Sequence, residues 1–429
     1  MQAGHQTLQV PRRANAGLNF YVSIAILVGP TQLAILEAVF PGIDHAPTLV
    51  IAVAIASMFA APLLTQFSFR SRSTSFVNGF ILRALLTAAL ALLVAVAMVT
   101  RLWEWLFFVS YLVLFFLLGL AHRIFFNVGW LHLMGFVTPK SRANAFVADV
   151  RRMNGLTTSF LSAGTLVILS LFGGKGFLLY IWGCAIAYGF WSFWVLARSI
   201  RSDSTLAVAL DESFSREAQR YPLLDLLKEF RNARTWRWLW PAFFPTFLVP
   251  PVLFLYAVKI LGLNWQDVLI VLIVAQLAAS LLLPRFVALF KSVTIERLRM
   301  LIFALAVLNL ILLSGNRIFS PHEVLALGGI AVNSILSAFI GQTLGIVVHN
   351  EVIRIGVSPS ESPRTFVIYN FALDVVPSIW MFIGSLVISV SSPHAAISPY
   401  EALCITGLSA AGFGLIITAF NKGRRLENG

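Results

Sequence analysis

Charged residues and cysteines are both scarce in this chain of 429 residues. Only 11% of the residues are charged and 59% are hydrophobic, whereas a soluble domain carries about 25% charged residues. So few charges cannot cover a surface that faces water on every side, which excludes a soluble enzyme, a disordered chain and a fibrous repeat. The sequence has two cysteines, Cys184 and Cys404, which argues against a disulfide framework or a cysteine-based metal site.

Long apolar runs take up most of the chain instead. A helix needs about 20 apolar residues to cross a bilayer, and the sequence contains twelve such runs. They lie near residues 18–40, 47–67, 76–99, 104–126, 146–172, 177–198, 236–260, 265–287, 296–315, 323–348, 366–390 and 399–420. The pattern predicts an all-α membrane protein with twelve transmembrane helices, and an even number places both termini on one side.

The distribution of basic residues predicts which side that is. The net charge is +13, and cytoplasmic loops of membrane proteins collect Lys and Arg. If the termini are cytoplasmic, then Arg101, Lys175, Lys259 and Arg317 fall on the outer side, while most of the others fall on the cytoplasmic side or at its edge. We therefore expect a multi-pass protein of the inner or plasma membrane with both termini in the cytoplasm. The basic residues act as topology signals, so we expect no nucleic-acid partner.

A polar stretch divides the predicted helices into six plus six. It covers residues 198–235 and contains a segment with helical periodicity, Pro222–Phe230, that we expect to lie as an amphipathic helix on the membrane surface. The predicted organisation is an N-terminal six-helix bundle at 1–197, this cytoplasmic linker, and a C-terminal six-helix bundle at 236–429.

The two predicted bundles also resemble each other in sequence. Leu36, Ala38 and Val39 recur as Leu255, Ala257 and Val258, at an offset of 219 residues (255 − 36). The same offset relates Ala60, Leu63, Leu64 and Phe67 to Ala279, Leu282, Leu283 and Phe286. The chain is thus predicted to contain two six-helix pseudo-repeats, an arrangement found in transporters that place their substrate site near the membrane midplane between the halves.

With these features the chain resembles the major facilitator superfamily over nearly its whole length. The signature of that family lies between the second and third spans, and the matching stretch here, Pro62 to Arg72, keeps its trailing basic residues Arg70 and Arg72. The arginine pattern of the family's fourth span has an echo in Arg123-Ile-Phe-Phe-Asn127-Val-Gly129. The resemblance implies a secondary transporter that moves a small molecule by alternating access.

Ionisable residues inside predicted spans are expensive and mark candidate sites. If the fourth span is long and tilted, His122, Arg123 and Asn127 face the central cavity, where Arg123 would attract an anionic substrate. If the span is short, Arg123 extends to the cytoplasmic interface as an anchor. Both interpretations stay open. Gln342 in the tenth span and Asn370 in the eleventh are further candidates for substrate contacts, although polar residues in spans also bond across helices.

Asp374 is the candidate for proton coupling. It lies roughly 12 Å into the eleventh span at 1.5 Å per residue, where a carboxylate must be protonated, paired or in a wet cavity. The alternative is a structural hydrogen bond to a neighbouring helix. Glu37, near the outer end of the first span, is a second candidate, for proton entry or an outer gate, or else an interfacial carboxylate in a wet vestibule.

Two pairs of opposite charge are candidate gates at the cytoplasmic side. Asp149 and Arg152 open the fifth span, and Glu351 and Arg354 end the tenth. Residues three apart share a helix face and can pair. Such pairs can open and close as the halves move, or can simply be solvated helix ends.

Other functional classes find no support in the sequence. It contains no phosphate-binding Gly-x-x-x-x-Gly-Lys-Ser/Thr loop and no metal-ligand spacing, so we expect neither an enzyme nor a cofactor. The predicted function is proton-coupled transport of a small, anionic organic solute by a monomer in the lipid bilayer. The alternatives are a transporter-like sensor or assembly partner, and a lipid flippase.

Overall fold

The computed structural model describes three helices in the N-terminal part of the chain and five in the C-terminal part. The first are α3 (Ala46–Thr65), α4 (Ser73–Thr100) and α5 (Glu104–Ala121); the second are α11 (Pro250–Leu255), the π-helix η5 (Tyr256–Ile260), α12 (Trp265–Leu289), α13 (Ile295–Phe319) and α14 (Glu323–Ile355). Scattered positions within 36–45, 152–171, 382–388 and 401–412 are described as well. Every helix or strand in these parts of the chain is a helix.

The described helices follow the apolar runs closely. The runs at 47–67, 76–99 and 265–287 correspond to α3, α4 and α12. Four described helices contain a stretch long and apolar enough to cross a membrane: Glu104–Ala121, Trp265–Phe286, Met300–Phe319 and Glu323–Gly341. Local signals set several ends, as at α12, where the Asn264 side chain accepts a hydrogen bond from the backbone N–H of Gln266 at 2.9 Å and caps the helix.

Two features differ from the sequence prediction. The tenth span was expected to end near residue 348, but α14 continues to Ile355. Charged residues end a hydrophobic run without interrupting backbone hydrogen bonds, and the helix stops only before Gly356, with Pro359 close behind. The seventh span ends in a π-helix, in which the Leu261 N–H bonds the Tyr256 carbonyl five residues back at 3.2 Å.

The chain divides into two compact units. Unit 1 comprises Met1–Tyr221 with His349–Val367, and unit 2 comprises Pro222–Val348 with Ile368–Gly429. The described residues do not include 198–249, so the boundaries expected from the sequence, 1–197, 198–235 and 236–429, remain a prediction.

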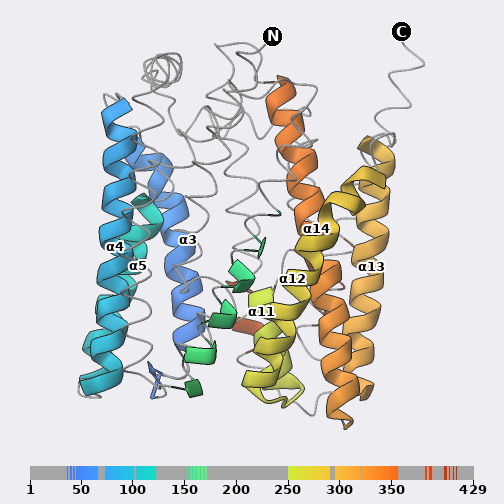
Figure 1. Cartoon of the computed structure of the whole chain (residues 1–429), viewed down its shortest axis with the longest axis horizontal. Helices are drawn as coiled ribbons and strands as arrows, with labels where there is room; N and C mark the ends of the chain where they lie inside the picture. Colours follow the sequence, from blue (N-terminus) through green and yellow to red (C-terminus); the bar gives the residue numbers. More distant parts are fainter. Residues whose placement is uncertain are drawn as a thin grey trace. The chain divides into compact units, whose positions relative to one another are not determined.

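In unit 1, α3 and α4 both pack against α5 (Figure 1). Aromatic rings fill the contact at one end, where Phe40 meets Phe108 and Tyr111 edge to face at centroid distances of 5.3 and 6.1 Å. Further along, α5 approaches α3 at Gly119, where an added Cβ would overlap the side chain of Ser57. The unit therefore packs through rings at one end and close helix contact at the other.

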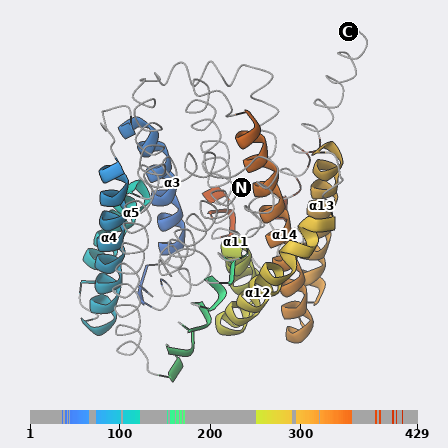
Figure 2. The same ribbon diagram turned by 45° about the horizontal axis from the view of Figure 1, so that its top comes forward.

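In unit 2, α12, α13 and α14 run side by side, as Figures 1 and 2 both show. Phe286 of α12 stacks on Phe339 of α14 at a centroid distance of 4.6 Å. The ends of the helices repeat those of unit 1: α3 and α12 begin 219 residues apart (265 − 46), and α5 and α14 begin at the same offset (323 − 104). The offset detected in the sequence therefore relates corresponding helices of the two units.

Candidate functional site

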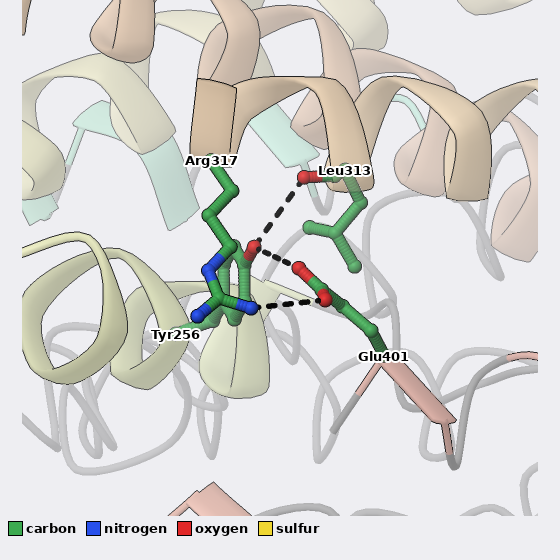
Figure 3. A network of polar contacts seen from close by, with 4 residues as sticks. All are labelled: Tyr256, Leu313, Arg317 and Glu401. Carbon is green, nitrogen blue, oxygen red and sulfur yellow. Dashed lines mark hydrogen bonds and ion pairs between the residues drawn. The ribbon is translucent and has the colours of Figure 1, made fainter. Parts of the chain in front are cut away.

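A polar cluster joins three segments of unit 2 at the end where η5 leads into α12 (Figure 3). The hydroxyl of Tyr256, the first residue of η5, donates to Glu401 Oε1 at 2.9 Å. Arg317 Nη1, near the end of α13, lies 3.5 Å from Glu401 Oε2. The Leu313 carbonyl of α13, 3.4 Å from the Tyr256 hydroxyl, is a second acceptor for that group. We call Tyr256, Arg317 and Glu401 the triad.

The triad is withdrawn from solvent. Tyr256 is completely buried, Glu401 is 5% exposed, and the Arg317 side chain is 19% exposed. A carboxylate removed from water is stable only with a charged or hydrogen-bonding partner, and Glu401 has both. The predicted topology places this end of unit 2 on the outer side of the membrane.

A second polar cluster connects α13 to α14. Asn333 of α14 donates to the side chain of Asn309 at 2.6 Å and to its carbonyl at 2.8 Å, and it accepts from Asn316 at 2.5 Å. Asn309 in turn donates to Ser337 Oγ at 2.8 Å. All four side chains are at least nine-tenths buried. We call Asn309, Asn316, Asn333 and Ser337 the asparagine seam.

The backbone of α14 is fitted to this seam. Gly329 lies directly against Asn316, and a Cβ at that position would overlap the asparagine side chain. Together, the seam and the triad place Asn309, Leu313, Asn316 and Arg317 along one stripe of α13, at helical positions i, i+4, i+7 and i+8. This helix is thus bonded to α14, to η5 and to the segment of Glu401.

The corresponding ends of the two units are finished differently. In unit 1, Glu104 at the start of α5 accepts a hydrogen bond from the backbone N–H of Gly42 at 2.9 Å. In unit 2 the corresponding residue, Glu323, lines an open cavity of about 710 Å³ together with Asn264, Trp265 and Gln266. The carboxylate closes the turn in unit 1, whereas in unit 2 it borders a hollow.

Most residues predicted to form a site lie outside the described part of the chain. These are Glu37, His122, Arg123, Asn127, Asp149, Asn370 and Asp374. Gln342, Glu351 and Arg354 lie on α14, and its helical backbone makes Glu351 and Arg354 neighbours on the helix surface. Arg152 is helical and half-buried, and its Nε is buried without a hydrogen-bond partner. Their roles in binding, coupling and gating remain predictions.

The sequence contained signals for both polar clusters. Glu401 lies inside the predicted span 399–420, so the rule that selected Asp374 also applies to it. Asn309 and Asn316, seven residues apart in the ninth span, share a helix face. Asn333 was expected to line a cavity or to bond across helices, and it bonds across helices. In the described part of the chain, no three His, Cys, Asp or Glu residues gather into a metal-binding group.

Comparison with known proteins identifies the fold. No family profile matches the sequence, and no curated protein matches it either. Solved structures match over almost the whole chain. A bacterial homologue of the iron transporter ferroportin, in an outward-facing state, is 13% identical with a TM-score of 0.64, covering 97% of this chain and 98% of its own.

Two further structures are described as proton symporters. The major facilitator superfamily proton:xylose symporter XylE is 12% identical with a TM-score of 0.62, covering 96% of this chain and 94% of its own. The E. coli fucose:proton symporter FucP is 12% identical with a TM-score of 0.57, covering 96% and 99%. The chain has the major facilitator superfamily fold.

This finding confirms the predicted fold class, an all-α membrane protein with the twelve-helix architecture of that superfamily. It also confirms the resemblance drawn from the architecture and the remnants of the signature motif. The matched proteins are transporters, in agreement with the expectation that the chain is not an enzyme. The apolar helices and the fold together make it a multi-pass membrane protein.

Proposed function

We propose that this protein is a secondary-active transporter that moves a small organic solute across the membrane by alternating access. The observation that carries the proposal is the major facilitator fold, which extends over about 97% of the chain. In this architecture the substrate site lies between two six-helix halves, which rock around it. A solute gradient or an ion gradient supplies the direction, and the solute stabilises whichever state fits it better.

The charge of the solute is proposed from Arg123. A guanidinium held within a span would attract an anionic group and bind it with paired hydrogen bonds. His122, Asn127, Gln342 and Asn370 supply the remaining polar contacts in this proposal. The iron of the ferroportin homologue is a less suitable cargo, since the described residues contain no metal-binding group.

Proton coupling is proposed through Asp374. A carboxyl group in the eleventh span can alternate between a protonated and a charged state as its surroundings change between the two sides. Two of the matched proteins are described as proton symporters, which supports this choice of ion. Glu37 would serve proton entry, and the pairs Asp149–Arg152 and Glu351–Arg354 would gate the cytoplasmic side.

The proposal includes the setting of the protein. We propose a monomer in the inner or plasma membrane with both termini in the cytoplasm. A protease-sensitive tag at either terminus would be cleaved only in inside-out vesicles. Cleavage in right-side-out vesicles would overturn the orientation.

The test begins with a search for the solute. A ligand that binds the folded state raises its stability by about 2.7 kcal/mol at a hundred times its dissociation constant, so pooled organic anions and sugars are screened by thermal shift at several pH values. Each hit is then tested in proteoliposomes for uptake driven by an imposed pH gradient. Uptake that collapses when the gradient is abolished supports proton-coupled transport, whereas binding without any movement of solute favours a sensor.

Three variants separate the residue roles in this assay. Asp374→Asn should abolish gradient-driven uptake, and Arg123→Ala should weaken binding of the solute. Arg101→Ala, at a predicted outer-loop arginine of the same half, is the matched control and should bind normally. Full uptake by Asp374→Asn would remove that residue from the coupling mechanism, and unchanged affinity in Arg123→Ala would support the interfacial interpretation.

A further inference from the structure

The triad holds together segments that are far apart in the sequence. Glu401 receives the Tyr256 hydroxyl at 2.9 Å and the Arg317 guanidinium at 3.5 Å, so one carboxylate connects η5, α13 and its own helical segment (Figure 3). Burial makes this arrangement specific, because a buried carboxylate that loses its partners becomes costly. The position of η5 is therefore linked to that of α13.

The backbone of η5 gives such a link a purpose. A π-helical turn is wider than an α-helical one and is rare outside single turns, which often lie at functional sites. Tyr256 begins this turn with its ring fully buried, and Ala257 and Ile260 are buried beside it, whereas Lys259 is exposed. The triad thus holds the turn by its first residue.

The segment before η5 has the opposite character. Pro250 and Pro251 open α11, and neither has a backbone N–H with which to bond the preceding turn. The seventh span therefore lacks two backbone hydrogen bonds just before the part that the triad holds.

We propose that Tyr256, Arg317 and Glu401 are positioning residues that keep the π-helical end of the seventh span fixed to α13 and to the Glu401 segment. Since all three belong to unit 2, movement of one unit against the other leaves the triad intact. Any bending of the seventh span is then confined to its prolines. This last role rests on the proposed transport function, whereas the anchoring itself does not.

Hydrogen–deuterium exchange of the full chain in nanodiscs tests the anchor without any solute. Tyr256→Phe removes the hydroxyl and keeps the ring, and Glu401→Gln removes the charge and keeps the shape. We expect the amides of 256–263 to exchange roughly tenfold faster in both variants, which corresponds to about 1.4 kcal/mol of local opening. Glu104→Gln, a carboxylate that bonds a backbone amide in unit 1, is the matched control and should leave 256–263 unchanged.

A double variant distinguishes the ion pair from a general loss of packing. In Glu401→Gln the Arg317 charge is left without its carboxylate, whereas Arg317→Gln combined with Glu401→Gln leaves no charge and allows a neutral hydrogen bond. The double variant should recover most of the protection lost in Glu401→Gln alone. Further loosening in the double variant would contradict the ion-pair role.

The proposal fails if 256–263 exchange at the wild-type rate in both Tyr256→Phe and Glu401→Gln. It also fails if Glu104→Gln accelerates the same amides equally, because the effect would then be global. If exchange responds as expected but no solute moves in proteoliposomes, the anchor stands and the transport function fails, so the two failures are distinguishable.

Discussion

Unit 1 buries Leu90, Val94 and Ala97 along α4, whereas unit 2 buries Asn309, Leu313 and Asn316 at the corresponding positions of α13, each 219 residues later (309 − 90). The helices have the same order and spacing, but the contacts between them differ in kind. Lipid tails are as apolar as leucine, so apolar packing between helices in a bilayer depends on shape, while hydrogen bonds between helices also fix direction and register. One architecture thus accommodates an apolar interior in one half and a bonded interior in the other.

The largest expected effect lies in the aromatic packing of unit 1. Phe108 is completely buried and meets both Phe40 and Trp105 edge to face. Phe108→Ala should lower the free energy of unfolding by about 3–5 kcal/mol, since a large ring leaves a cavity that helices cannot fill. Thermal unfolding in detergent measures the change. Phe160→Ala, at a ring that is 66% exposed in the same unit, is the control, and an equal loss there would contradict the role of packing.

The asparagine seam should respond to single and combined changes in opposite ways. Asn333→Leu strands the groups of Asn309 and Asn316 that Asn333 now bonds, at an expected cost of about 2 kcal/mol in the same unfolding assay. The triple variant Asn309→Leu, Asn316→Ala, Asn333→Leu copies the unit 1 residues Leu90, Ala97 and Leu114. It should cost less than the single variant because no amide remains unbonded, and additive losses would show that the bonds themselves carry the stability.

Close helix contact gives the next prediction. Gly119→Ala copies Ala338, its counterpart in unit 2 (338 − 119 = 219), but places a Cβ into the side chain of Ser57. We expect a loss of about 1–2 kcal/mol in thermal unfolding, from overpacking between α3 and α5. Gly328→Ala in α14, where an added Cβ meets no atom within 4 Å, is the control. It should be neutral or slightly stabilising, since alanine favours a helix.

The smallest effect is expected from the two carboxylates that begin α5 and α14. Glu104→Ala removes the hydrogen bond to the Gly42 backbone and should cost about 1 kcal/mol. Glu323→Ala, at the cavity of unit 2, should stay within about 0.5 kcal/mol of wild type, as surface changes do. Parallel unfolding of the two variants measures the difference, and equal losses would remove this distinction between the units.

Much of the fold was predictable, because a membrane imposes a simple rule. Every backbone group in lipid must bond internally, so a long apolar run has to be a helix. For this reason the runs at 104–126 and 323–348 were correct in their first residues, Glu104 and Glu323. The far ends were less certain, and α14 extends to Ile355, since hydropathy records where apolar residues stop and not where helical hydrogen bonding stops.

The polar contacts were less predictable, although their residue types were visible. Sequence rules indicated that polar groups in spans must find partners, and Asn333 was recognised on that basis. They could not identify the partners, since Tyr256 and Glu401 are 145 residues apart. The π-helix η5 was not foreseen, because its sequence, Tyr-Ala-Val-Lys-Ile, is that of an ordinary apolar helix end.

The sequence by itself determined the class of protein, the positions of its spans and the repeat of its two halves, since these follow from local hydropathy and from an offset within the chain. Only the tertiary structure decided that α13 is bonded on one stripe to α14, η5 and the Glu401 segment, while α4 buries apolar residues at the same positions. A single sequence records which residues need partners, but burial and direction, which determine the energy of each contact, exist only once the helices have packed.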